Sequence, residues 1–104
     1  MDLELVKGDL DMEKYTIDFT EVKTVWYFYE TIKKGLKLPD WCGRNPDAIW
    51  DMISGYMKYP AIVYIKGVNT LSDKLQEEME IILRIFTRAV NWHDEGEFEF
   101  EIID

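Results

Sequence analysis

The segment AIVYIK, residues 61–66, is a short and nearly continuous apolar run. Such a run is typical of a strand inside a parallel sheet, because both of its faces are covered there. Two other segments, residues 14–19 and 97–104, alternate apolar and polar residues, as strands with one solvent face do. The sequence therefore predicts a three-stranded sheet with the apolar run in its centre.

The segments between these strands carry apolar residues at helical spacing. Thr20 is the candidate cap of the first helix, and Trp26 belongs to its apolar stripe. Asn45-Pro46 is a typical helix start, because Asn caps well and proline is favoured at the first helical position. Tyr56 completes the inward stripe of this second helix. The expected helices span about 20–34, 46–54 and 72–90, and residues 67–71 hold a turn or a further helical turn.

Strands that are separated by helices are joined by parallel crossovers. The predicted class is therefore α/β, with a three-stranded parallel sheet in the order 1-2-3 and three to four helices. Helices on one side would leave the other face of the sheet partly open, with the glutamates of the last strand covering some of it. A chain of 104 residues is long enough for one compact domain. We assign residues 14–104 to that domain and residues 1–13 to an N-terminal extension.

Charge and cysteine content limit the classes of function. Twenty-one acidic residues against 12 basic ones give a net charge of -9, which opposes direct binding of nucleic-acid phosphate. Either solubility or a basic protein partner explains such an excess. The single cysteine excludes an internal disulfide framework. Because the sequence shows neither a membrane-spanning apolar run nor the pattern of a signal peptide, a cytoplasmic protein is predicted.

Asp47 and Asp51 are the first candidates for chemistry. They are one helical turn apart, so they share a face of the predicted helix, where like charges repel. Some hydrolases use two carboxyls as acid and base, but nothing around this pair favours protonation of one of them. His93 is the only histidine and Cys42 the only cysteine, and neither a zinc-site spacing nor a phosphate-binding glycine loop is present. We therefore predict no catalysis, no metal and no cofactor.

Large aromatic side chains surround this acid pair. Trp41, Trp50 and Tyr56 lie within the same short stretch as Arg44, and Trp, Tyr and Arg are the residue types that dominate interface hot spots. In contact with a basic protein, the carboxylates would pair with its positive charges and the aromatic rings would provide a complementary surface. The alternative is that Trp50 and Tyr56 belong to the core and that the aspartates are solvated, with Asp47 favoured by the helix dipole.

The segment LKLPDWCGRNPDAIWDMISGYMKYP, residues 36–60, resembles the barstar family of intracellular inhibitors of barnase-type ribonucleases. The matching features are the Leu-Pro pair, the glycine-bearing aromatic loop, the DAIWD core at 47–51 and the glycine-aromatic pair at 55–56. The similarity continues to the last strand and covers roughly residues 14–104. It implies a barstar-like fold, which agrees with the prediction from the apolar pattern.

The resemblance also implies a role for each residue of the segment. In the family, the second helix and the loop before it block the active site of the ribonuclease. By position, Asp51 enters the pocket for substrate phosphate, Asp47 adds a second contact and Trp41 packs against the cleft. The implied partner is a basic ribonuclease of barnase type, bound one to one by a monomer. The implied partner-binding residues are Trp41, Cys42, Gly43, Arg44, Asn45, Asp47, Ala48, Trp50, Asp51, Gly55, Tyr56 and Arg88.

Five of these positions depart from the family pattern, and at two of them, Trp41 and Tyr56, one aromatic residue replaces another. Cys42 stands in place of an aromatic residue and Arg44 in place of an acid, while Arg88, or its neighbour Thr87, aligns with a contacting glutamate. One hypothesis is a partner with acidic groups facing Arg44 and Arg88, and another is that Arg88 neutralises a carboxylate of its own chain. The alternative function is a barstar-like module that binds a different toxin, or a regulator that is not a nuclease.

Overall fold

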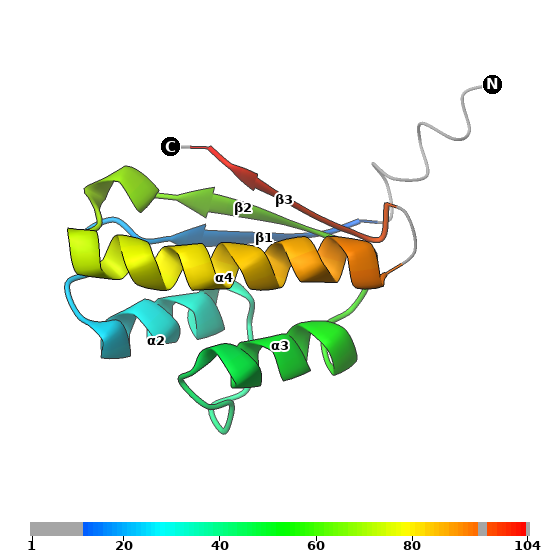
Figure 1. Ribbon diagram of the computed structural model, residues 1–104. Coiled ribbons are helices and arrows are strands. Elements are labelled where there is room, and N and C mark those ends of the chain that lie inside the picture. Colours follow the sequence, from blue (N-terminus) through cyan, green and yellow to red (C-terminus); the bar gives the residue numbers. More distant parts are fainter. Residues whose placement is uncertain (1–11, 94–95, 104) are drawn as a thin grey trace.

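The computed structural model describes residues 12–93 and 96–103, which form one sheet with helices on one of its faces (Figure 1). The three strands are parallel and lie in the order β1-β2-β3. Their bounds are Glu13–Asp18 for β1, Ala61–Lys66 for β2 and Phe98–Ile102 for β3. The predicted class, strand order and central strand are thus confirmed. Of the predicted N-terminal extension, residues 1–11 lie outside the described residues.

The helices form the second layer. Their bounds are Val25–Gly35 for α2, Pro46–Gly55 for α3 and Asp73–Trp92 for α4, and a 3-10 turn, η1, spans Val68–Thr70. Helix α2 lies against β1 and α4 against β3, while α3 packs mainly on α4. Consequently α3 lies at the margin of the molecule, below α4 in Figure 1, with one side exposed to solvent.

The N-cap of α2 is Thr24, so the prediction of Thr20 is wrong. The Thr24 hydroxyl accepts a hydrogen bond from the backbone nitrogen of Tyr27 at 3.1 Å. Thr20 instead closes a turn after β1, because its hydroxyl and its backbone nitrogen both donate to Asp18, at 2.6 and 3.0 Å. This side-chain turn competes with helix formation, and Glu21 beside it takes a left-handed φ of 68°.

Two aromatic residues that were predicted to face inward are exposed. Helix α2 places Phe28 in the core, where its ring stacks on Phe19 with centroids 4.9 Å apart. The same helical phase turns Trp26 outward, and 51% of its surface is exposed. Tyr56 is also 51% exposed, because it caps α3 and no longer follows the helical stripe.

Helix α4 is longer than predicted. Ser72 caps it as the sequence indicates, accepting from the backbone nitrogen of Leu75 at 3.3 Å. The helix continues to Trp92, since no glycine or proline interrupts the chain there before Gly96. The additional residues bring Trp92 into contact with α3, where it meets the ring of Trp50.

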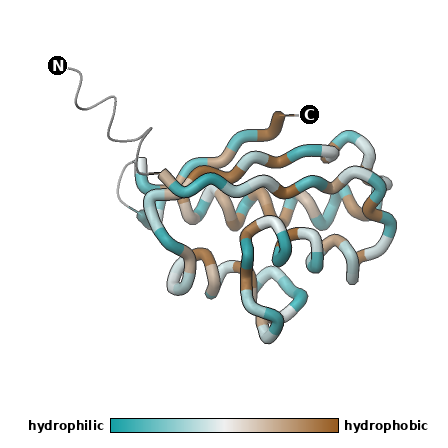
Figure 2. Tube along the Cα trace, turned by 180° about the vertical axis from the view of Figure 1, so that it is seen from behind, coloured by the Kyte–Doolittle hydropathy of each residue, from teal (hydrophilic) through white to brown (hydrophobic). Residues whose placement is uncertain are grey.

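The face of the sheet opposite the helices is partly open. Buried and exposed residues alternate along β1, and Figure 2 shows hydrophobic and hydrophilic residues alternating along the strands. On the open face Lys14, Ile62 and Glu99 lie in register. The apolar run of β2 is therefore covered fully on one face only, as expected for helices on one side of the sheet. Its second face, with Ile62 and Tyr64, is half-buried between the two neighbouring strands.

Candidate partner-binding surface

The loop at 36–45 leads into α3, and Asn45 determines where this helix begins. The side-chain oxygen of Asn45 accepts from the backbone nitrogen of Ala48 at 2.8 Å, and Pro46 takes the first helical position. The predicted helix start is therefore confirmed. Asp47 lies in the first turn, where the helix dipole favours an acidic side chain.

Helix α3 has two faces of opposite character. Ile49 and Ile53 are fully buried, whereas Asp47 and Asp51 are exposed. We refer to these two aspartates as the acid face. Within the described part of the chain, neither aspartate side chain takes part in a hydrogen bond or an ion pair. Because carboxylates one turn apart repel each other, this face is poised to accept a cation from outside.

Two exposed aromatic side chains lie beside each other at the margins of α3. Trp41 in the loop is 71% exposed, and its ring meets that of Tyr56 edge to face with centroids 6.2 Å apart. Exposed Trp and Tyr side chains are enriched in protein interfaces. Gly55, next to Tyr56, is also exposed, and a Cβ added to it would have no neighbour within 4 Å. The end of the helix is therefore open to a partner.

Cys42 and Gly43 support the loop from beneath. Cys42 is 4% exposed, its Sγ lies 3.5 Å from the carbonyl oxygen of Gly43, and burial raises the pKa of its thiol. A Cβ added to Gly43 would lie 3.2 Å from the Cβ of Ala48, so the loop passes close to the first turn of α3. The structure thus places Cys42 under the candidate surface and Trp41 on it.

Arg44 belongs to a charge network within the molecule. Its Nε donates to Oε2 of Glu30 at 2.6 Å, and its guanidinium lies 4.5 Å from the ring centroid of Trp26. The same oxygen of Glu30 accepts from Nζ of Lys33 at 3.3 Å, and Lys33 also donates to the backbone oxygen of Asp40 at 3.1 Å. The middle of the loop, at Asp40, and its last part, at Arg44, are thereby tied to α2, and the charge of Arg44 is offset by Glu30.

Sequence reasoning missed Glu30, Lys33 and Trp26 as supports of this surface. The spacing of Glu30 and Lys33 on one helix does predict that they pair with each other. Nothing in the sequence connects them to Arg44, which is 14 residues from Glu30 and reaches it only through the folding of the loop onto α2.

We expect Glu30→Gln to remove a stabilising contribution that depends on pH. Partial burial pushes the pKa of Glu30 upward, but the hydrogen bonds and charges of Arg44 and Lys33 outweigh this and hold it below its ordinary value. A carboxyl with a lowered pKa stabilises the fold above its unfolded pKa of about 4.3, and the contribution is lost as pH falls through the folded value. Melting temperatures of the two proteins should therefore differ near pH 7 and converge only as pH falls below the unfolded pKa and through the lowered folded pKa. A difference that stays constant across this range would mean that the charge of Glu30 is not its source.

Arg88 makes a contact of another kind. Its guanidinium carbon lies 4.0 Å from the ring centroid of Trp50, and Trp92 meets the Trp50 ring at an angle of 79° with centroids 5.8 Å apart. Among the residues that the structure describes, no carboxylate pairs with Arg88, so the hypothesis that it neutralises a neighbouring acid is wrong for that part of the chain. Trp92 is 63% exposed. It was missed because α4 was expected to end before it.

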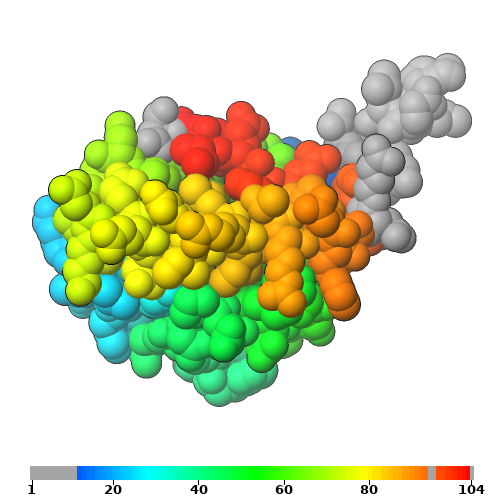
Figure 3. Space-filling model, in the orientation of Figure 1, coloured from blue at the N-terminus to red at the C-terminus, as the bar shows by residue number. Residues whose placement is uncertain are grey.

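Most of the predicted residues lie on one projecting surface, with Cys42 buried beneath it. Figure 3 shows α3 and the loop before it, in green tones, projecting below α4, with the orange end of α4 adjoining them. Such a surface, with exposed carboxylates and rings, suits the binding of a protein. Catalysis by a carboxyl pair would require a cavity that encloses a substrate, and Asp47 and Asp51 are open to solvent.

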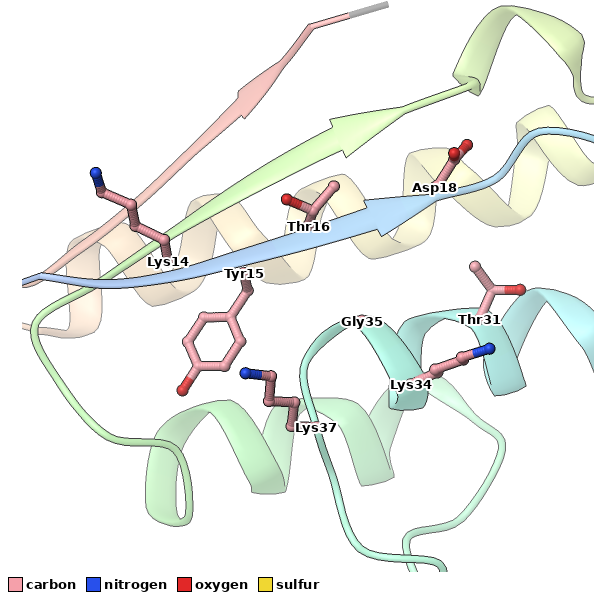
Figure 4. Close-up of a pocket in the computed structure, with 8 residues that line it drawn as sticks. All are labelled: Lys14, Tyr15, Thr16, Asp18, Thr31, Lys34, Gly35 and Lys37. Carbon is pink, nitrogen blue, oxygen red and sulfur yellow. The ribbon is translucent and has the colours of Figure 1, made fainter.

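A hollow of the molecule lies away from this surface. It measures about 440 Å³, opens beside β1 and α2, and contains none of the predicted site residues. Figure 4 shows Lys14 and Lys37 on opposite sides of the strand there. In the described ranges no group of three or more potential metal ligands comes together, and His93 packs on the ring of Tyr59. No helix of these ranges is long and apolar enough to cross a bilayer.

The chain is similar to known proteins along nearly its whole length. A family model described as Barstar (barnase inhibitor) matches residues 12–103. A protein of Bacillus subtilis (strain 168) named "Putative ribonuclease inhibitor YrdF" is 28% identical over 92 residues, which make up 88% of this chain and 98% of that protein. The resemblance inferred from residues 36–60 is thereby confirmed.

Proposed function

Because this chain belongs to the barstar family of barnase inhibitors, we propose that it inhibits a ribonuclease of barnase type by covering the active site of the enzyme. The observation that carries the proposal is the acid face of α3, where Asp47 and Asp51 are exposed and lack partners among the described residues. In this proposal the chain acts as an inhibitor and has no catalytic role of its own.

The acid face takes the place of RNA. An enzyme that cleaves RNA holds the substrate phosphate with basic side chains, and these positive groups attract carboxylates equally. Asp51 enters the phosphate site and Asp47 adds a second contact beside it, as the family resemblance implies. The repulsion between the two carboxylates in the free protein is offset once cations of the enzyme lie next to them.

Trp41 and Tyr56 provide the apolar contact area around the two carboxylates. Trp41 and Tyr56 are exposed in the free protein and become buried in the complex, where the exclusion of water strengthens the neighbouring charge pairs. The loop that carries Trp41 is held in place before binding by the ion pair of Arg44 with Glu30 and by the hydrogen bond from Lys33 to the backbone oxygen of Asp40. A pre-ordered loop loses less conformational entropy on association, which favours tight binding.

We also propose the stoichiometry, the cellular compartment and the biological role of this inhibitor. One copy of the chain binds one ribonuclease, without nucleic acid in the complex, and acts in the cytoplasm as an immunity protein. Such an inhibitor protects the cell that makes the enzyme only if the two proteins meet before export. The net charge of -9 favours a basic enzyme as the partner.

Titration of ribonuclease activity tests the proposal directly. Each enzyme of a barnase-type panel is assayed on RNA with increasing amounts of the protein, and at least one enzyme should lose its activity at a one-to-one ratio. An unrelated acidic protein of similar net charge controls for non-specific binding to basic enzymes. Absence of inhibition across the panel, including a ribonuclease encoded beside this gene, would contradict the proposal. It would favour a barstar-like module for another toxin or regulator.

The association rate with the inhibited ribonuclease should fall as salt is added. The acidic chain and a basic enzyme attract each other over distances that ions screen, since the Debye length shrinks from about 30 Å at 0.01 M to about 3 Å at 1 M salt. Stopped-flow measurements across this range should show a decrease of roughly tenfold or more in the association rate, with a smaller change in dissociation. A flat response would argue against electrostatic attraction between the two proteins.

A further inference from the structure

We propose that Arg88, together with the rings of Trp50 and Trp92, binds a carboxylate on the surface of the partner ribonuclease. This inference rests on the proposed function and makes the partner more specific. The enzyme must present basic groups to the acid face of α3 and an acidic residue to the adjoining end of α4. Because α3 and α4 pack on each other, both contacts belong to one interface.

The contact with Trp50 leaves hydrogen-bond donors of Arg88 free. The guanidinium carbon lies 4.0 Å from the ring centroid, which is the contact distance of a cation on an aromatic face. A guanidinium resting on a ring still carries N–H groups at its rim, and these form a fork that matches the two oxygens of a carboxylate. The ring also limits the motion of the side chain, so less rotamer entropy is lost when a partner binds.

Arg88 differs in this respect from the other two arginines of the chain. Arg44 donates to Glu30 at 2.6 Å, and Arg84 lies 3.9 Å from a carboxylate oxygen of Glu80. For Arg88 the contact is a ring, and no acid of the described ranges offsets its charge. The candidate surface therefore carries one positive group next to its two negative ones.

Trp92, one helical turn after Arg88, contacts the ring on which Arg88 lies. It is 63% exposed and stands nearly perpendicular to the ring of Trp50, at 79°. Indole rings that become buried around an ion pair exclude water from it and so strengthen it. The occupant is a protein carboxylate and not a phosphate of RNA, because Asp51, the residue after Trp50, and the net charge of -9 repel a polyanion.

Affinity measurements with the ribonuclease that the chain inhibits test Arg88 separately from the acid face. Arg88→Met removes the charge and keeps an unbranched side chain on the ring of Trp50. Arg84→Met, one turn earlier on the same helix, is the matched control. We expect Arg88→Met to raise Kd about tenfold or more. Arg84→Met should change Kd by less than about twofold, because the charge of Arg84 is already paired with Glu80 and both side chains are largely exposed.

Double-mutant cycles then identify the carboxylate. Acidic residues around the active site of the same ribonuclease are replaced one at a time by the corresponding amides and measured against wild type and Arg88→Met. One of them should couple to Arg88 by about fivefold or more and to Arg84 not at all. If Arg88→Met binds within about threefold of wild type, or if no acid couples to it, the inference is overturned while the proposed function stands. A wild-type chain that inhibits no ribonuclease overturns both.

Discussion

The complex of the ribonuclease with Asp51→Ala is expected to be weaker than the wild-type complex by about 2 to 5 kcal/mol, or roughly 30-fold to several thousand-fold in Kd. The substitution removes a carboxylate from the centre of the interface and leaves the enzyme's cations buried without a partner. The complex of barnase with barstar is itself a standard example of such magnitudes, so this range is one that the family already exhibits. Inhibition titrations at several enzyme concentrations would measure Kd.

Two further variants test whether the loss of affinity depends on where the negative charge lies or only on the loss of one negative charge. Glu77→Ala removes one negative charge from the exposed side of α4, and it should change Kd by less than about threefold. The increase in Kd caused by Asp47→Ala should lie between those of Asp51→Ala and Glu77→Ala, because Asp47 adds a second contact to that of Asp51. If Asp51→Ala bound as tightly as Glu77→Ala, imitation of the substrate phosphate would not be the mechanism of inhibition.

The positions of several helices and strands could be predicted because they depend on sequence signals within a single helical turn or a single strand. Asn45 followed by Pro46 predicts a helix start correctly, because the cap and the first helical position are local. The apolar run at 61–66 and the alternating segment at 97–104 identify two of the strands for the same reason. Their parallel order then follows from the helices between them, since a crossover must return the chain to the same end of the sheet.

Competition between neighbouring residues explains the errors in α2. Thr20 and Thr24 are both good caps by residue type, and the choice between them depends on Asp18, which holds Thr20 in a turn. The buried stripe of α2 contains Phe28, Tyr29 and Ile32, and Trp26, about half a turn from Phe28, reaches the surface. A side-chain turn at the end of a strand is one of the signals that a search for caps has to weigh.

The candidate surface was predictable in part. Residue type and spacing placed Asp47 and Asp51 together on the outer side of a helix, where the structure has them. The two arginines looked alike in the sequence. The structure separates them because Arg44 reaches Glu30 on α2, whereas Arg88 reaches the ring of Trp50 on α3. Contacts between elements of this kind leave no local pattern, and only the packing of the helices reveals them.

Replacing Ile49 by alanine is expected to lower the free energy of unfolding by about 2 to 5 kcal/mol. Ile49 is fully buried on the inner face of α3, two positions before Asp51 in the sequence. Its truncation removes apolar contacts and leaves a cavity beneath the helix, which the neighbouring side chains fill only in part. Urea unfolding, followed by the fluorescence of the tryptophans, would measure the change.

Asp51→Ala is the matched comparison for this measurement, because the two variants alter opposite faces of one helix. Asp51 is exposed and lies one turn from a like charge, so its removal should change the unfolding free energy by less than about 0.5 kcal/mol. Below the unfolding transition, Ile49→Ala should bind the ribonuclease nearly as well as wild type. If Ile49→Ala unfolded at the wild-type urea concentration, α3 would not be anchored through this residue. If the folded variant lost as much affinity as Asp51→Ala, the interface would depend on the exact seating of α3 as much as on the carboxylate it presents.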